Sequence, residues 1–363
     1  MNKIDLNKKL LEAQSIEEQE LINKNREIEK DRIETRHSEL QKRKELENKF
    51  SSIDLGDRNQ DRIKALQEEN LNYFTSARKS KVFLNDDFDG KVPYFERNVI
   101  LLTGLTGDGK STTCANLAFH AIAQGQKALV ISNEEYSSDI YNRVACLCMG
   151  RPYTDHSNFS DQDIFKFNQM IEIMSHRLTV IDDSYGGDLG QTSTIEGMKA
   201  IFSSIIKNKS NFDVIIIDYY QNVSSSTKVP SKKDWEVQSE FAKFLDSVKN
   251  LVHAPIILLA QKKPNSEKIS FKESIEGRKL ILNTATCAIE MKADRENLKT
   301  DWTIHKSRFT NAVGETISTG FKHGRFVKYD DKFINEVETI KIEKATRGYR
   351  SKILSKEVVI EEE

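Results

Sequence analysis

"GLTGDGKST", residues 104–112, is the stretch that decides the fold. It has the form G-x-x-x-x-G-K-[ST], follows the apolar run "NVILLT" and precedes the helical stretch "STTCANLAFHAIAQ". A glycine-rich turn between a buried strand and a helix presents backbone N–H groups to an anion at the helix N-terminus. The stretch therefore predicts a phosphate-binding loop (a P-loop) in an α/β domain.

The residue types of this loop predict a nucleotide with its metal ion. Lys110 is expected to reach the β- and γ-phosphates, and the Ser111 hydroxyl to ligate Mg²⁺. The expected ligands are therefore the phosphates of a nucleotide and Mg²⁺, and the family resemblance given below implies that the nucleotide is ATP. The residues expected around the nucleotide are Gly104, Thr106, Gly107, Asp108, Gly109, Lys110, Ser111 and Thr112.

Polar side chains end three further apolar runs. Asp218 ends "DVIIID". A carboxylate buried there costs free energy unless a cation or hydrogen-bond donors face it. We therefore expect Asp218 to bind the water ligands of the Mg²⁺ ion. Glu134 follows "KALVIS" and is the candidate to polarise an attacking water, with Glu135 as the alternative. Either acid could also be an ordinary residue of a helix first turn. Gln261 ends "APIILLAQ" as a candidate γ-phosphate sensor, or simply a polar strand end.

The apolar runs between residues 82 and 330 alternate with helical stretches, which predicts a mainly parallel sheet covered on both faces. After Gln261 the sequence predicts short strands in an antiparallel extension and no further helices. Residues 331–363 form a charged, acidic-ended tail with little core-forming character. The chain thus divides into 1–56, 57–81, 82–330 and 331–363.

Residues 1–56 predict a long charged helix, because acids and bases alternate at i, i+4 spacing and no strict heptad repeat is present. A solvated helix and a partner-binding or oligomerising helix both fit this pattern. A second helix is expected over 57–81, where Ile63, Leu66, Asn70 and Phe74 form a partly apolar stripe. A helix this short must dock on its own subunit or on a neighbour.

The composition excludes several classes of protein. The 363 residues carry 55 Lys+Arg against 56 Asp+Glu, a net charge of −1, which excludes a globally basic nucleic-acid binder. The four cysteines lack metal-ligand spacing, and no apolar run approaches the length of a membrane span. We expect a cytoplasmic protein with no membrane partner. The Lys-, Asn- and Ile-rich composition hints at a phage or plasmid gene acting in the bacterial cytoplasm.

Lys306 and Arg308 lie two residues apart in "WTIHKSRFTNAVGETI", residues 302–317. The segment alternates like a strand, so both side chains are expected on one face of the sheet. Two cations side by side repel unless an anion faces them. A surface ion pair and a phosphate group both meet that requirement.

Taken in order, these motifs resemble the DnaB-type hexameric replicative helicases (superfamily 4), which have a RecA-like ATPase core. The resemblance covers residues 81–330. It rests on "GLTGDGKST", "ISNEEYSSDIYNRV", "IIIDYYQ", "LLAQKK", "FKESIEG" and "HKSRFTNAVGET". The fold it implies is a RecA-like P-loop NTPase core with a mainly parallel sheet and an antiparallel extension, preceded here by the long charged N-terminal helix.

The resemblance also implies roles for the motif residues. Glu134 becomes the catalytic base, Asp218 the Walker B acid and Gln261 the γ-phosphate sensor. Arg308 becomes an arginine finger with Lys306 as its companion, both acting on ATP bound to the adjacent subunit. The implied activity is ATP hydrolysis that drives a ring, usually of six subunits, along single-stranded DNA and unwinds duplex DNA during replication.

Three features depart from the family pattern. Lys272 stands where the family has Arg, and Ala285-Thr286 stands where it has Ala-Asp. The charged helix occupies the place of the globular N-terminal domain that many members use for primase contact, so the resemblance does not imply a primase partnership. A loader, primase or other replisome partner is expected, if at all, on this helix.

Two loops are rich in Ser, Pro and Lys and are candidates to track single-stranded DNA through its phosphates. Ordinary exposed loops of a Lys-rich protein would look the same. The candidate lysines are Lys228, Lys232, Lys233, Lys262, Lys263 and Lys268.

Two other functions remain open on sequence alone. One is a RecA-like ATPase that is not a helicase, such as a recombinase, a loader or a switch-type ATPase. The other is a scaffold built on the long helix, with ATP used only for assembly. DNA-stimulated ATPase activity and strand separation distinguish a helicase from both.

Overall fold

The structure is a computed structural model that describes most of the chain after residue 82. The described residues are 83–184, 192–223, 234–264, 269–275 and 280–342, with the isolated positions Gln41, Lys44, Gln67 and Glu68. Apart from those positions, the expected helices over 1–56 and 57–81 lie outside the described residues, as does the tail after residue 342.

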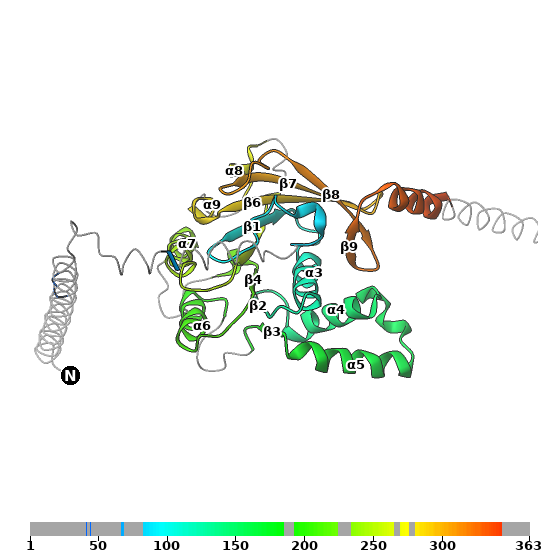
Figure 1. Cartoon of the computed structure of the whole chain (residues 1–363), viewed down its shortest axis with the longest axis horizontal. Coiled ribbons are helices and arrows are strands. Elements are labelled where there is room, and N and C mark those ends of the chain that lie inside the picture. Colours follow the sequence, from blue (N-terminus) through cyan, green and yellow to red (C-terminus); the bar gives the residue numbers. More distant parts are fainter. Residues whose placement is uncertain are drawn as a thin grey trace, which may run out of the picture. The chain divides into compact units, whose positions relative to one another are not determined.

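The described residues form a nine-stranded sheet in the order β3-β2-β4-β5-β1-β6-β7-β8-β9 (Figure 1). The pairs from β3 to β6 are parallel, and β7, β8 and β9 continue the sheet as antiparallel strands. The predicted parallel sheet with an antiparallel extension is confirmed. The strands are β1 (Val99–Gly104), β2 (Ala128–Ser132), β3 (Leu178–Ile181), β4 (Val214–Asp218), β5 (Ile256–Gln261), β6 (Cys287–Asp294), β7 (Lys299–Ser307), β8 (Thr316–Lys322) and β9 (Arg325–Lys328).

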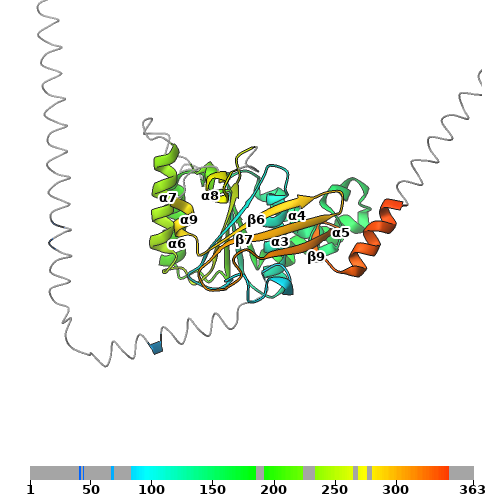
Figure 2. The ribbon, with the colours of Figure 1, turned by 90° about the horizontal axis from the view of Figure 1, so that it is seen from above.

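Helices cover both faces of the parallel part of the sheet (Figure 2). Side chains of α3 and α4 belong to one core cluster with Phe88, and those of α6, α7 and α9 to a second cluster on the other face. The helices are η1 (Asp86–Phe88), α3 (Lys110–Ala123), α4 (Ser137–Met149), η2 (Tyr153–Asn158), α5 (Asp161–Ser175), α6 (Ile195–Lys207), η4 (Tyr220–Asn222), α7 (Asp234–Val248), α8 (Phe271–Ser274) and α9 (Leu280–Thr284).

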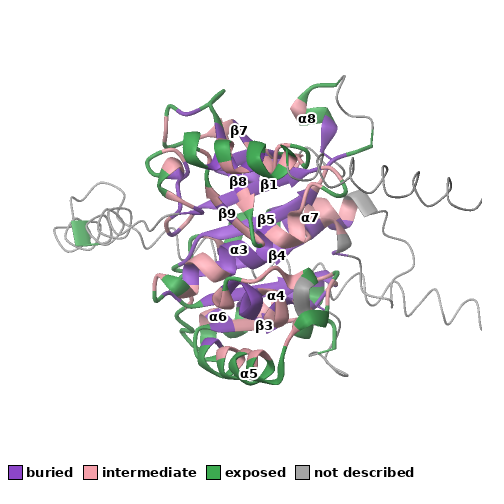
Figure 3. Ribbon diagram, turned by 90° about the vertical axis from the view of Figure 1, so that its right-hand side faces the viewer, coloured by how far each residue is buried: buried purple, intermediate pink, exposed green. Residues whose placement is uncertain are grey.

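The central strands form because their residues are mostly apolar, with many β-branched side chains. Every residue of β1, β2 and β4 is buried, and β5 is buried up to Gln261 (Figure 3). Strands packed by helices on both faces require such continuous apolar runs. The polar residues that follow each run are therefore held at one edge of a rigid sheet.

Two expectations for the C-terminal part are wrong. The helices do not stop after Gln261, because α8 and α9 follow it. The tail after Asp330 begins as a helix over 331–342, in which Phe333 and Val337 are buried. These two residues, four apart, bury one side of a helix in which charged residues are frequent, and this short pattern was missed among the charges. None of the helices within the described ranges is long and apolar enough to cross a membrane.

Candidate functional site

The P-loop connects β1 to α3 at the carboxyl end of the strand. Gly107 and Gly109 have φ of 91° and 90°, and Gly109 caps α3 from the left-handed region, where glycine is favoured. The Lys110 ammonium lies over the loop and donates to the carbonyls of Leu105 at 3.0 Å and Gly104 at 3.4 Å. The Lys110 side chain is thereby held against the loop.

Asp108 and Arg295 brace the loop against the β6–β7 turn. One Asp108 oxygen accepts from the Leu105 N–H at 2.6 Å, and the other accepts from the Ala293 N–H at 3.4 Å. The Arg295 guanidinium donates to the Gly107 carbonyl at 2.8 Å. Both sides of the loop are thus fixed by the strand pair that carries the antiparallel extension.

Asp218 lies at the end of β4 and is 1% exposed. Burial, followed by the neighbouring Glu134 and Glu135, raises the pKa of Asp218 to about 7, although Lys110 and a hydrogen bond with Ser111 oppose the shift. One Asp218 oxygen is buried and finds no hydrogen-bond partner among the described residues. Such a carboxylate is poised to gain a cation.

A magnesium ion fits this arrangement. Hard cations prefer carboxylate and hydroxyl oxygens, and a P-loop Ser and a strand-end Asp are such ligands. Ser111 at the start of α3 would coordinate the ion directly. Asp218 would bind the water ligands of the ion, which would give its own unpartnered oxygen a hydrogen-bond partner. When bound, the ion supplies positive charge to the phosphate oxygens.

The two acids after β2 have different environments. Ser132 pairs with Asp218 in the sheet, which brings the following turn to the same edge. The Glu135 carboxylate is paired with Arg143 at 2.9 Å and is half-buried. Glu134 is exposed, and its charge acts on Asp218. The geometry favours Glu134 over Glu135 as the residue that faces a water.

Gln261 reaches the P-loop directly. It pairs with Gly104 across β5 and β1, and its side-chain amide donates to the Thr106 hydroxyl at 2.6 Å. Gln221, which follows β4, donates to the Gln261 carbonyl at 3.0 Å. The carboxyl ends of four neighbouring strands, β2, β4, β5 and β1, therefore bring Glu134, Asp218, Gln261 and Lys110 to one edge.

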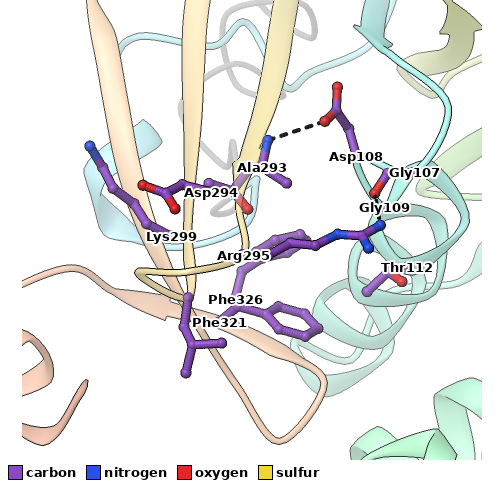
Figure 4. Close-up of a pocket in the computed structure, with 12 residues that line it drawn as sticks. Gly107, Asp108, Gly109, Thr112, Ala293, Asp294, Arg295, Lys299, Phe321 and Phe326 are labelled. Carbon is purple, nitrogen blue, oxygen red and sulfur yellow. Dashed lines mark hydrogen bonds between the residues drawn. The ribbon is translucent and has the colours of Figure 1, made fainter. Parts of the chain in front are cut away.

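A cavity of about 360 Å³ opens beside the loop (Figure 4). Arg295 points across it toward Gly107 and Gly109, and Phe321 and Phe326 form an apolar wall. Its size and its position next to the loop suit the base and sugar of a nucleotide. The sequence did not reveal Arg295, Phe321 and Phe326 as residues of the site, because they come from the β6–β7 turn and from β8 and β9 and carry no motif.

Lys306 and Arg308 lie far from the P-loop of their own chain. The Arg308 N–H donates to the Thr286 carbonyl, and the Thr286 N–H donates to the Val99 carbonyl at the start of β1. Gly104 is five residues further along that strand, which is roughly 16 Å at 3.3 Å per residue. Both side chains instead reach the last turn of α9, where Arg308 donates to the Asn283 carbonyl at 2.7 Å and Lys306 to that of Leu282. As expected, they share one face of the sheet.

The structure describes two of the six candidate DNA-binding lysines, Lys262 and Lys263. Lys263 is exposed. Lys262 is 7% exposed and ion-paired with Glu290, so in this structure it does not face solvent and we remove it from the set. The remaining four (Lys228, Lys232, Lys233 and Lys268) lie outside the described residues.

The sheet order, the P-loop and the strand-end Asp, Glu and Gln define a RecA-like P-loop nucleotide-binding protein. The model of the DnaB-like helicase C-terminal domain matches residues 86–275, more than half of the chain. The chain belongs to this family. The resemblance inferred from the ordered motifs is thus confirmed.

Solved structures agree with this fold. A structure of a DnaB-like replicative helicase, described with its interactions with primase, matches with a TM-score of 0.52 and 16% identity over 65% of this chain. A second structure, of an ATPase domain, matches with a TM-score of 0.57 and 15% identity, over 76% of this chain and 100% of that domain. At these identities the likeness establishes the fold alone. This chain spans 58% of the DnaB-like helicase chain, and no curated protein sequence matches it.

Proposed function

We propose that this protein is an ATP-driven, ring-shaped DNA helicase that translocates on single-stranded DNA and unwinds duplex DNA during replication. The observation that carries the proposal is the edge where the P-loop, Asp218, Glu134 and Gln261 meet, in a chain of the helicase family. ATP is the proposed substrate, with Mg²⁺ held by Ser111 and Asp218.

The residues of this edge support hydrolysis of the γ-phosphate. Lys110 and the loop N–H groups bind and orient the phosphates, and Glu134 accepts the proton of an attacking water. Gln261 contacts the loop at Thr106, so its amide is placed to respond to the occupancy of the site. These steps position the water and neutralise developing charge, which is most of what phosphoryl transfer requires.

The remaining cations are proposed to come from the neighbouring subunit. Arg308 lies at the level of the start of β1 and Lys306 at the level of Leu101, and both side chains reach α9 rather than their own P-loop. In a ring of subunits, proposed to be six, this surface would meet the next nucleotide. Desolvation, Arg308 and Lys249 lower the pKa of Lys306, which an incoming phosphate would reverse.

The exposed Lys263, together with the lysines of 228–233 and 268, is proposed to contact the DNA backbone. The charged N-terminal helix is proposed as the surface for a loader, primase or other replisome partner. We also propose that the protein works in the cytoplasm, and that its gene is carried by a phage or plasmid.

ATP hydrolysis measured with and without single-stranded DNA, combined with unwinding of a forked duplex, tests the proposal. We expect hydrolysis to rise with single-stranded DNA and unwinding to require ATP. Lys110→Ala serves as the inactive control. Hydrolysis that ignores DNA, together with a lack of strand separation, would point to a RecA-like ATPase that is not a helicase.

A further inference from the structure

The strand that carries the two cations contains a β-bulge. Along the β6–β7 pair, Ala288 pairs with Lys306 and Ile289 pairs with Ile304, so the register shifts by one residue between them. His305 is the extra residue on β7. A bulge changes the face on which the following side chains emerge, and bulges are common beside active sites.

This shift decides where the two cations point. Trp302 and Ile304 belong to the core cluster on the α3 face. Unbroken alternation would place Lys306 and Arg308 on that same apolar face. Instead both side chains emerge on the opposite face, where they meet the carbonyls at the end of α9. Without the bulge, neither cation could reach the surface proposed for the neighbouring nucleotide.

Two contacts hold His305 in place. Its Nε2 atom lies 2.7 Å from one Glu290 oxygen, and its ring stacks on Phe271 with a centroid distance of 3.8 Å and an interplanar angle of 8°. The other Glu290 oxygen accepts from Lys262, the residue after Gln261. Glu290 therefore connects the carboxyl end of β5, next to Gln261, to the bulge of β7.

The pair between Glu290 and His305 is partly buried. The Glu290 side chain is 24% exposed and the His305 side chain 29%. The hydrogen bond with His305, followed by Lys262, lowers the pKa of Glu290 to about 2. Partial burial strengthens such charge-assisted contacts, whereas fully exposed pairs contribute little.

We propose that His305 and Glu290 are positioning residues that hold the β7 bulge and so aim Lys306 and Arg308 at the nucleotide of the adjacent subunit. This inference rests on the proposed function. In this role the two residues act through the cations that they orient.

The test is hydrolysis by His305→Ala, with nucleotide binding measured separately. We expect kcat to fall about 10²-fold, because displacing a catalytic group by about 1 Å costs that much, while KM and nucleotide binding at the variant's own P-loop stay unchanged. His305→Gln, which keeps a donor for Glu290, should restore most of the activity. His253→Ala removes a histidine that pairs with Glu96 elsewhere and should match the wild type.

Mixing two kinds of variant subunit shows whether His305→Ala impairs its own P-loop or the site of the neighbouring subunit. Combined with Lys110→Ala subunits, which keep intact cations, His305→Ala subunits should regain activity, because some intact P-loops then face an intact Arg308. Recovery should match that of the benchmark mixture of Arg308→Ala with Lys110→Ala. If the mixture of Arg308→Ala with Lys110→Ala regains activity and the mixture of His305→Ala with Lys110→Ala does not, the positioning role is contradicted and the arrangement in trans stands.

The remaining outcomes also decide the question. No recovery in the benchmark, despite co-assembly, would overturn the arrangement in trans and the positioning role with it. A raised KM or weaker nucleotide binding would mean that His305 serves its own subunit's site. If His305→Ala fails to fold, Glu290→Gln in the same mixtures distinguishes the same outcomes.

Discussion

Burial of the ionised Asp218 carboxylate lowers the stability of the folded protein. Its pKa of about 7 in the folded protein compares with 3.8 ordinarily, so the folded state retains a proton that the unfolded state has lost. The stabilisation from this proton is complete below about pH 4 and is lost as the pH rises through 7. At neutral pH the site therefore holds a carboxylate that only a cation can fully satisfy.

Asp218→Asn should stabilise the protein in the absence of nucleotide and magnesium while abolishing hydrolysis. The neutral amide has no charge to desolvate, so its free energy of unfolding should exceed that of the wild type at pH 8 by on the order of 1 kcal/mol or more. The difference should shrink toward pH 4. Denaturant titration at both pH values measures it. A difference that does not depend on pH would contradict the assigned burial effect.

The choice between Glu134 and Glu135 is also testable. Glu134→Gln should lower kcat by roughly 10²- to 10⁴-fold with nucleotide binding intact, because it removes a general base. Glu135→Gln should keep most turnover and lose on the order of 1 kcal/mol of stability, because it breaks the half-buried pair with Arg143. Single-turnover hydrolysis and thermal unfolding of the two variants measure both effects. The reverse pattern would assign the base to Glu135.

At the scale of elements, local motifs were predictable and pairing details were not. The P-loop, the strand ends and the sheet type follow from contiguous residues, because a buried strand and a helix N-terminus leave local patterns. The bulge at His305 depends on the register between β6 and β7, which no local pattern fixes. Arg295 reaches Gly107 through tertiary packing alone.

The most buried aromatic side chain of the helix over 331–342 is Phe333, which packs on the sheet beside the buried Val337. Phe333 packs against Gly320 so closely that a Cβ at that glycine would lie 2.6 Å from the ring. Gly320→Ala should therefore release the helix, as should Phe333→Ala, since truncating a buried Phe costs about 3–5 kcal/mol. Limited proteolysis should cut both variants faster after Asp330. Glu338→Ala, at an exposed position of the same helix, is the matched control, and equal cleavage in all three would contradict the anchoring role of Phe333.

At the scale of the whole molecule, the proposed arrangement has each chain contribute to two different sites. The P-loop, Asp218 and Gln261 lie at one end of the parallel strands, whereas Arg308 lies level with the other end and Lys306 with Leu101. The rigid nine-stranded sheet between them prevents the cations from folding back onto their own nucleotide. If the proposed arrangement in trans holds, hydrolysis requires two neighbouring subunits and should depend on assembly.

Turnover per subunit should therefore fall when the protein is diluted below the concentration at which it assembles. An isolated subunit lacks the Lys306 and Arg308 that a neighbour is proposed to supply, and by analogy with other arginine fingers the loss should be on the order of 10³-fold or more. The hydrolysis rate per subunit, measured across a dilution series together with particle mass, tests this expectation. Arg308→Ala should show low turnover at every concentration, because assembly no longer supplies the finger. Full turnover in samples that contain only single subunits would contradict the arrangement in trans.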